Sequence, residues 1–190
     1  MPAPRAPLTE LLGDLARALD RLDARWYLFG AQAAILHGVA RLTADVDVTV
    51  SLGARPTTDL VAVLTASGFD PRVDDVATFA EAMQVVPVVH RATRIPVDVV
   101  LAGPGLEELF LSRVEERLVD DVRIPVAAAE DLVAMKLLAG RAKDLEDASA
   151  IVRMRGAQLR PELIRETLQV LEQALDRRDL LPAFERLLRS

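Results

Sequence analysis

The sequence predicts an α/β fold of the α+β type, with a mixed β-sheet flanked by helices and followed by a C-terminal helical bundle. Three observations predict it. Valines alternate with polar residues over 46–50, which is the period-two pattern of a strand with one polar face. Two β-rich runs, 84–90 and 95–101, lie on either side of a short polar stretch and indicate an antiparallel hairpin. From Glu130 onward the pattern is helical almost to the end of the chain.

The other elements follow from helical spacing and from glycines that end helices. Leucines recur at three- and four-residue intervals in the first predicted helix, and Gly38 and Gly68 each stand where a helix would end. On these patterns we expect further helices over 8–22, 31–36, 56–67 and 106–116, and further strands over 26–29 and 118–126. The elements divide the chain into an α/β core over residues 1–128 and a helical region over 129–190, expected to pack on the core.

The 190-residue chain is acidic and lacks cysteine. Its formal net charge is -6, and its 23 basic side chains are 21 arginines and two lysines. The lack of cysteine excludes disulfide-held folds, zinc fingers, iron–sulfur clusters and cysteine nucleophiles. No signal peptide or membrane-spanning run is recognisable, so we expect a soluble, cytoplasmic protein that does not bind a membrane. Net acidity disfavours sequence-independent binding of nucleic acid, and nothing indicates reading of a DNA sequence.

Two carboxylates are expected on one face of the strand over 46–50. Asp45 and Asp47 lie two residues apart, so both point to the same side, and like charges at that distance repel unless a cation lies between them. Their oxygens suit Mg²⁺ or Mn²⁺. The alternative is an edge strand with a solvated acidic face.

Asp98 interrupts the apolar run 95–101, and its alternative interpretation is a surface strand residue. If its strand neighbours that of Asp45 and Asp47, three carboxylates converge. Such a group can hold two metal ions for in-line phosphoryl or nucleotidyl transfer.

Several other residues are candidates on weaker signals. Gly30 lies between a predicted strand and a predicted helix, where backbone N–H groups can meet a phosphate, although ordinary turns use glycine too. Both lysines, Lys136 and Lys143, fall within eight residues, which indicates either a phosphate-facing helix or two solvated side chains. Arg41 either holds a phosphate or forms a structural salt bridge. We expect His37 to satisfy helix carbonyls, His90 to lie on the surface and Trp26 to lie in the core.

These residues resemble the motifs of a known enzyme family. Gly30-Ala31, then Asp45-x-Asp47, then Asp98 on a later strand resembles the nucleotidyltransferases of the DNA polymerase β superfamily. The surrounding pattern G-A-x-A-x-x-x-H-G-x-x-R-x-T-x-D-x-D looks like that of minimal nucleotidyltransferases, and it is most similar to the branch of the AbiEii-type toxins. The stretch 130–147 is similar to the helical E-D-L-x-x-x-K-x-x-A-x-R-x-K-D-x-x-D signature of the same branch.

The resemblance implies a role for each matching residue. Asp45 and Asp47 would bind both metal ions, and Asp98 would bind one of them and orient or deprotonate the attacking hydroxyl. Ala31 stands where many relatives have serine, so one hydroxyl contact to phosphate is missing. The residues implied to bind the nucleotide are Gly30, Ala31, Arg41, Thr43, Lys136, Arg141, Lys143 and Asp144.

The implied function is the transfer of a nucleoside monophosphate from an NTP, with ATP binding expected, to a hydroxyl acceptor. Two Mg²⁺ or Mn²⁺ ions would assist, and pyrophosphate would leave. The acceptor would be a tRNA 3′ end or a protein hydroxyl, in a toxin–antitoxin or defence system with a cognate toxin or antitoxin partner. The alternatives are a small-molecule adenylyltransferase of the antibiotic type and a catalytically weak module that binds a nucleotide or a partner.

Overall fold

The computed structural model describes residues 6–189, which form two compact units. The first unit comprises the chain up to Gln32 and Leu42–Val126, and the second comprises Ala33–Arg41 and the chain from Ala127 on. The change of unit between residues 32 and 33 falls inside one short helix, α2 (Gly30–Leu36). As a statement about domains, the expected division into 1–128 and 129–190 stays a prediction.

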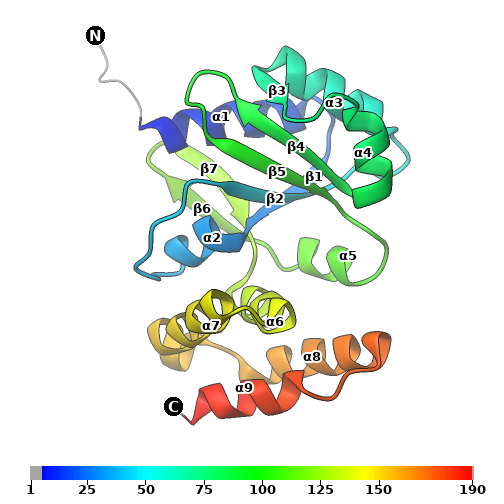
Figure 1. Ribbon diagram of the computed structural model, residues 1–190. Coiled ribbons are helices and arrows are strands. Elements are labelled where there is room, and N and C mark those ends of the chain that lie inside the picture. Colours follow the sequence, from blue (N-terminus) through cyan, green and yellow to red (C-terminus); the bar gives the residue numbers. More distant parts are fainter. Residues whose placement is uncertain (1–5, 190) are drawn as a thin grey trace. The chain divides into compact units, whose positions relative to one another are not determined.

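Seven strands among the described residues form one mixed sheet in the first unit (Figure 1). Their order is β3-β4-β5-β2-β1-β7-β6. The strands β2 and β5 pair in parallel, as do β1 and β7, and the remaining pairs are antiparallel. In chain order the strands are β1 Arg25–Phe29, β2 Val46–Ser51, β3 Phe69–Pro71, β4 Val85–His90, β5 Pro96–Leu101, β6 Glu115–Val119 and β7 Val122–Val126. The mixed sheet that the sequence predicts is therefore confirmed.

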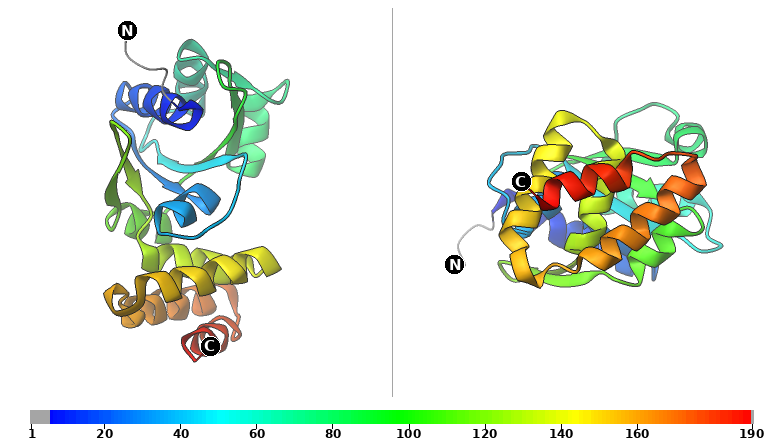
Figure 2. Two further views of the ribbon diagram at one scale, coloured as in Figure 1. Left: turned by 90° about the vertical axis from the view of Figure 1, so that its left-hand side faces the viewer. Right: turned by 90° about the horizontal axis from the view of Figure 1, so that it is seen from below.

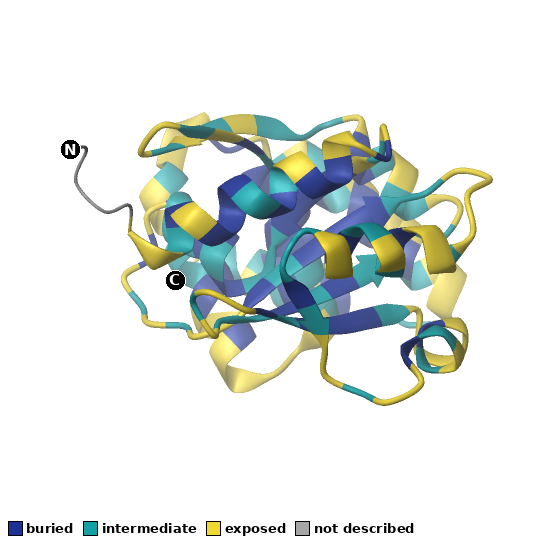
Figure 3. Cartoon of the chain, turned by 90° about the horizontal axis from the view of Figure 1, so that it is seen from above, coloured by how far each residue is buried: buried dark blue, intermediate teal, exposed yellow. Residues whose placement is uncertain are grey.

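Amphipathic helices cover this sheet. The helix α1 (Pro7–Asp20) packs against α3 (Thr57–Ala66) and β7, and α3 also contacts α4 (Val76–Met83). A shorter helix, α5 (Leu106–Leu111), contacts β1. Buried and exposed residues alternate along the helices (Figure 3), as expected where one stripe of each helix meets the sheet.

The strand β2 is the centre of the core. Its valines, Val46, Val48 and Val50, are fully buried, while Asp47 between them is only half-buried. The period-two pattern of the sequence is thus realised, with an apolar face toward the core and a carboxylate on the other side. Because β2 lies between β5 and β1, the alternative of an acidic edge strand is wrong.

The second unit is helical. It contains α6 (Ala129–Ala139), α7 (Ala142–Arg155), the 3₁₀ turn Gly156–Gln158, α8 (Pro161–Leu175) and α9 (Leu180–Leu188). The helix α6 packs against α7, α8 and α9, and α8 runs beside α9 (Figure 2). Gly140 ends α6 in the left-handed conformation with its N–H bonded to the Lys136 carbonyl, as is common for a glycine at a helix C-terminus.

The structure also corrects several expected elements. The helix expected over 106–116 ends at Leu111, and the strand expected over 118–126 is the hairpin β6–β7, which turns at Asp120 with a positive φ. The strand β3 and the helix α4 have no counterpart in the sequence-based assignment. Among the described residues, no helix is both long and apolar enough to cross a membrane.

Candidate functional site

The strands β2 and β5 place two of the predicted carboxylates side by side. Asp47 and Asp98 are direct register partners in the parallel pair β2–β5. Residues in register on neighbouring strands share a face of the sheet and lie about 4.8 Å apart along the hydrogen-bonding direction. The expectation that the strand of Asp98 neighbours that of Asp47 is therefore met. Asp45 precedes β2 by one residue and is exposed.

Gly30 packs directly against the Asp47 side chain. It follows β1, in which Phe29 is the register partner of Asp47, and its φ is +68°. A Cβ atom at position 30 would lie 2.9 Å from Cγ of Asp47 and would overlap one of its carboxylate oxygens. Glycine is therefore required at position 30 for two reasons: its φ is positive, and the Asp47 carboxylate leaves no room for a Cβ atom.

The other two carboxylates have partners within the first unit. The Thr43 hydroxyl donates a hydrogen bond to Asp45, and the Arg72 guanidinium forms an ion pair with Asp98. Within residues 6–189, no group of three or more His, Cys, Asp or Glu side chains is arranged so that it could hold a metal ion. The convergence of all three carboxylates on two ions therefore stays a prediction.

The carboxylate set nevertheless fits a hard divalent cation in two respects. Its donors are carboxylate oxygens, which are the ligands that Mg²⁺ and Mn²⁺ prefer. Its backbone placement puts Asp47 and Asp98 in register on neighbouring strands, with the Asp47 carboxylate lying against Gly30.

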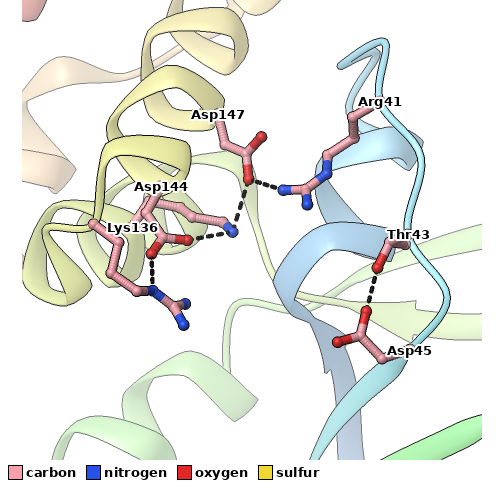
Figure 4. A network of polar contacts seen from close by, with 7 residues as sticks. Arg41, Thr43, Asp45, Lys136, Asp144 and Asp147 are labelled. Carbon is pink, nitrogen blue, oxygen red and sulfur yellow. Dashed lines mark hydrogen bonds and ion pairs between the residues drawn. The ribbon is translucent and has the colours of Figure 1, made fainter.

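The second unit contains a buried network of charged side chains (Figure 4). The Lys136 ammonium lies 2.9 Å from a carboxylate oxygen of Asp144 and 2.9 Å from one of Asp147. Arg41 forms an ion pair with Asp147, and Arg141 forms one with Asp144. The side chains of Lys136, Asp144 and Asp147 are only 8%, 1% and 7% exposed. The structural salt bridge considered for Arg41 is therefore present.

The network shifts the pKa of Asp144. Burial alone raises the pKa of this carboxyl, but hydrogen bonds from Arg141 and Lys136, together with their charges, outweigh burial and lower the pKa below its ordinary value of 3.8. Glu130 shows the same balance. Burial raises its pKa, whereas backbone hydrogen bonds and the Arg160 side chain lower it below the ordinary value of 4.5. Both groups are therefore held in the ionised form.

These two shifts predict loss of stability in acid. A carboxyl whose pKa is lower in the folded state stabilises the fold above its unfolded-state pKa, and this contribution disappears as the pH falls toward the folded-state pKa. We expect the melting temperature to stay level down to about pH 5 and to fall steadily below about pH 4.5, followed by circular dichroism. The Asp144→Asn variant should lose less on acidification than the wild type. An unchanged melting temperature down to about pH 3 contradicts the expectation.

Substitution of Gly30 should impair both stability and activity. We expect Gly30→Ala to destabilise the fold by about 1–2 kcal/mol, because an L-residue is strained at this φ. It should also lower the nucleotidyl transfer that the motif resemblance implies at least about tenfold, because the new methyl group displaces the Asp47 carboxylate. Gly53→Ala is the matched control, since Gly53 has φ +60° but nothing within 4 Å of its added Cβ. Equal activity of the two variants would refute the argument.

The remaining predicted residues lie as follows. Lys143 is exposed, and Ala31 is buried at the start of α2. Nε2 of His37 donates a 2.8 Å hydrogen bond to the Ala127 carbonyl, which belongs to no helix, so the expectation that His37 satisfies helix carbonyls stays a prediction. Trp26 is buried, as expected.

His90 is a correction. It ends β4, but it is 2% exposed and contacts Asp14 and Thr93, so the expectation of a surface residue is wrong. Arg72 and Asp147 pair with predicted site residues but were not among the candidates from the sequence. Asp147 could have been recognised because it ends the 130–147 signature, whereas no sequence pattern points to Arg72.

Comparison with solved structures identifies the class of fold. The antibiotic-resistance factor ANT(2'')-Ia superposes with a TM-score of 0.59 at 14% identity, covering 90% of this chain and 95% of that one. An antigenic nucleotidyltransferase-like protein from Paracoccidioides brasiliensis gives 0.56 at 17% identity, covering 94% and 92%. The lincosamide antibiotic adenylyltransferase LnuA gives 0.50 at 14% identity, covering 74% and 95%. The fold is therefore that of a nucleotidyltransferase.

The family follows from a sequence model. Residues 13–189 match the family described as nucleotidyl transferase AbiEii toxin, type IV toxin–antitoxin system, and the chain belongs to this family. The resemblance found in the motifs is thus confirmed over nearly the whole chain. A comparison with curated proteins found no match.

Proposed function

We propose that this nucleotidyltransferase moves a nucleoside monophosphate from an NTP to a hydroxyl acceptor with the help of two Mg²⁺ or Mn²⁺ ions held by Asp45, Asp47 and Asp98. The observation that carries the proposal is the register of Asp47 and Asp98 on β2 and β5, with the Asp47 carboxylate lying against Gly30, where a Cβ would overlap it. A new bond forms between the acceptor oxygen and the α-phosphorus, the bond between the α- and β-phosphates breaks, and pyrophosphate leaves.

The residues divide the work. Bound divalent ions would supply charge neutralisation of the triphosphate. Asp47 is fixed by a buried strand and by contact with Gly30, so its carboxylate is oriented before the substrate arrives. We propose that Asp98 orients or deprotonates the acceptor hydroxyl. Backbone N–H groups of Gly30 and Ala31 are proposed to contact the phosphates.

Further nucleotide contacts are part of the same proposal. We propose such contacts, which the motif resemblance implies, for Thr43 near Asp45 and for a set of residues in the second unit: Arg41, Lys136, Arg141, Lys143 and Asp144. Of these, Lys143 is exposed, and the side chain of Arg141 is 64% exposed although it pairs with Asp144. Lys136 and Arg41 already have carboxylate partners, so a phosphate would have to share them.

The family description supports a role in a toxin–antitoxin system. The acceptor that we propose in that role, or in defence, is a tRNA 3′ end or a protein hydroxyl, with a cognate protein as partner. The second candidate is a small-molecule acceptor. It is favoured by the likeness in fold to LnuA and to ANT(2'')-Ia, which has been solved with adenylyl-2''-tobramycin. A tRNA or protein acceptor remains the preferred candidate because the family model matches the sequence itself, whereas these structures share only the fold.

Transfer assays with labelled nucleotides test the proposal. The full chain is incubated with Mg²⁺ and each NTP carrying a label in the α-phosphate, together with total tRNA, a candidate partner protein, an aminoglycoside, a lincosamide or no acceptor. We expect the α-label, and not a γ-label, to appear in tRNA or protein. Label in the small molecules alone favours the second candidate. Label in no product, together with nucleotide affinity unchanged by Asp47→Ala, contradicts the proposed function.

A further inference from the structure

Arg72 is hydrogen-bonded to the row of register partners that runs across the sheet through Asp98 and Asp47. It directly follows β3, and its backbone N–H donates a 3.0 Å hydrogen bond to the Pro87 carbonyl on β4. Pro87 is the register partner of Asp98 on β5, and Asp98 is the register partner of Asp47 on β2. Arg72, Asp98 and Asp47 therefore lie along one line across the sheet.

The guanidinium of Arg72 crosses an intervening strand to reach Asp98. Neighbouring strands are about 4.8 Å apart, so β3 lies two spacings, or about 10 Å, from β5. Only a long side chain spans that distance, and the Arg72 side chain forms an ion pair with Asp98. Since both side chains are partly exposed, at 37% and 41%, the pair is open to exchange with ions from solution.

We infer that Arg72 is an intramolecular counter-ion that competes with the divalent cation for Asp98 and so weakens metal loading. This inference rests on the proposed function, because it concerns the same three carboxylates. The pairing neutralises one of three neighbouring negative charges in the metal-free protein. It also directs Asp98 toward β3, consistent with the lack of a ready-made three-carboxylate cluster among residues 6–189. Loading the ion requires Asp98 to leave Arg72.

Direct titration with Mn²⁺, without nucleotide, tests the inference. The proteins are the wild type, Arg72→Gln, which keeps much of the side-chain length but removes the charge, and Arg72→Lys, which keeps the charge. Arg91→Gln is the matched control. Arg91 also pairs with an aspartate, Asp70, the middle residue of β3, so the control removes the same charge from the same unit without touching Asp98.

We expect Arg72→Gln to bind Mn²⁺ about two- to fivefold more tightly than the wild type, the range set by an exposed ion pair, with Arg72→Lys close to the wild type. Arg91→Gln should leave the affinity unchanged. Mn²⁺ should also raise the melting temperature of Arg72→Gln more than that of the wild type, which reports binding independently of catalysis.

The outcomes separate the inference from the proposed function. Unchanged or weaker Mn²⁺ binding by Arg72→Gln, with binding by the wild type intact, overturns the inference and leaves the proposed function standing. An equal gain in Arg91→Gln also overturns it, because the effect would then be one of overall charge. Binding only by Arg72→Gln supports it. If neither the wild type nor Arg72→Gln binds Mn²⁺, the metal-dependent function itself is contradicted, and the inference is overturned with it.

Discussion

We expect Asp47→Asn to lower nucleoside monophosphate transfer at least about 1,000-fold while the protein stays folded. The substitution keeps the shape of the side chain but removes the negative charge that is held against Gly30 and beside Asp98. Charge stabilisation by a bound cation amounts to several kcal/mol of the barrier, and each 1.4 kcal/mol corresponds to about a factor of ten in rate. Initial rates of transfer from an α-labelled NTP measure the loss, and circular dichroism confirms the fold.

Asp70→Asn provides the control for this substitution. Asp70 lies on β3 of the same sheet and pairs with Arg91, away from the row that contains Asp47 and Asp98. Its loss removes the same charge from the same unit, so transfer should stay within about twofold of the wild type. If Asp47→Asn retained more than a tenth of wild-type activity, Asp47 would not hold the ion that assists the reaction.

The carboxylates were predictable because they depend on local patterns. Asp47 interrupts a run of valines at alternate positions, and this alone places it on the face of β2 opposite the core. Asp98 does the same on β5. The hairpin of β4 and β5 follows from two apolar runs and the polar stretch between them. The only long-range condition in the prediction was that the strand of Asp98, β5, lies beside the strand of Asp47, β2.

The missed elements share a physical cause, since each depends on distant partners. The strand β3 has only three residues and exists because it pairs with the end of β4, so it carries no period of its own. Arg72 follows that strand, and its place in the site depends on two contacts across the sheet: its backbone hydrogen bond to Pro87 and its ion pair with Asp98. His90 looks like a strand-end residue but is buried because α1 brings Asp14 to it.

The second unit shows the same limit for charged residues. The 130–147 signature was evident in the sequence, and the stretch is helical as the pattern predicts, in α6 and α7. The burial of Lys136 was not predictable, because it depends on two carboxylates from α7 that lie one helical turn apart. Nor does the sequence show that residues 33–41 pack with the C-terminal helices and bring Arg41 to Asp147.

Lys136→Ala should destabilise the protein by about 3 kcal/mol, the lower end of the range for removing one partner from a buried ion pair. Asp144 and Asp147 would then remain buried with a partner removed. The lower end applies because Arg141 and Arg41 still contact these carboxylates. For a chain of this length the loss corresponds to a drop of roughly 6–12 °C in melting temperature, measured by calorimetry.

Lys143→Ala is the matched control for this large effect, because it removes the only other lysine and that side chain is exposed. It should change the melting temperature by less than about 2 °C.

Combining Lys136→Met with Asp144→Asn should recover part of the stability that Lys136→Ala loses, since one buried negative charge is removed together with its cation. A melting temperature for Lys136→Ala equal to that of Lys143→Ala would show that Lys136 contributes nothing to the second unit. In that case the only effect still expected of Lys136→Ala is a higher KM for the NTP, from its proposed contact with the nucleotide.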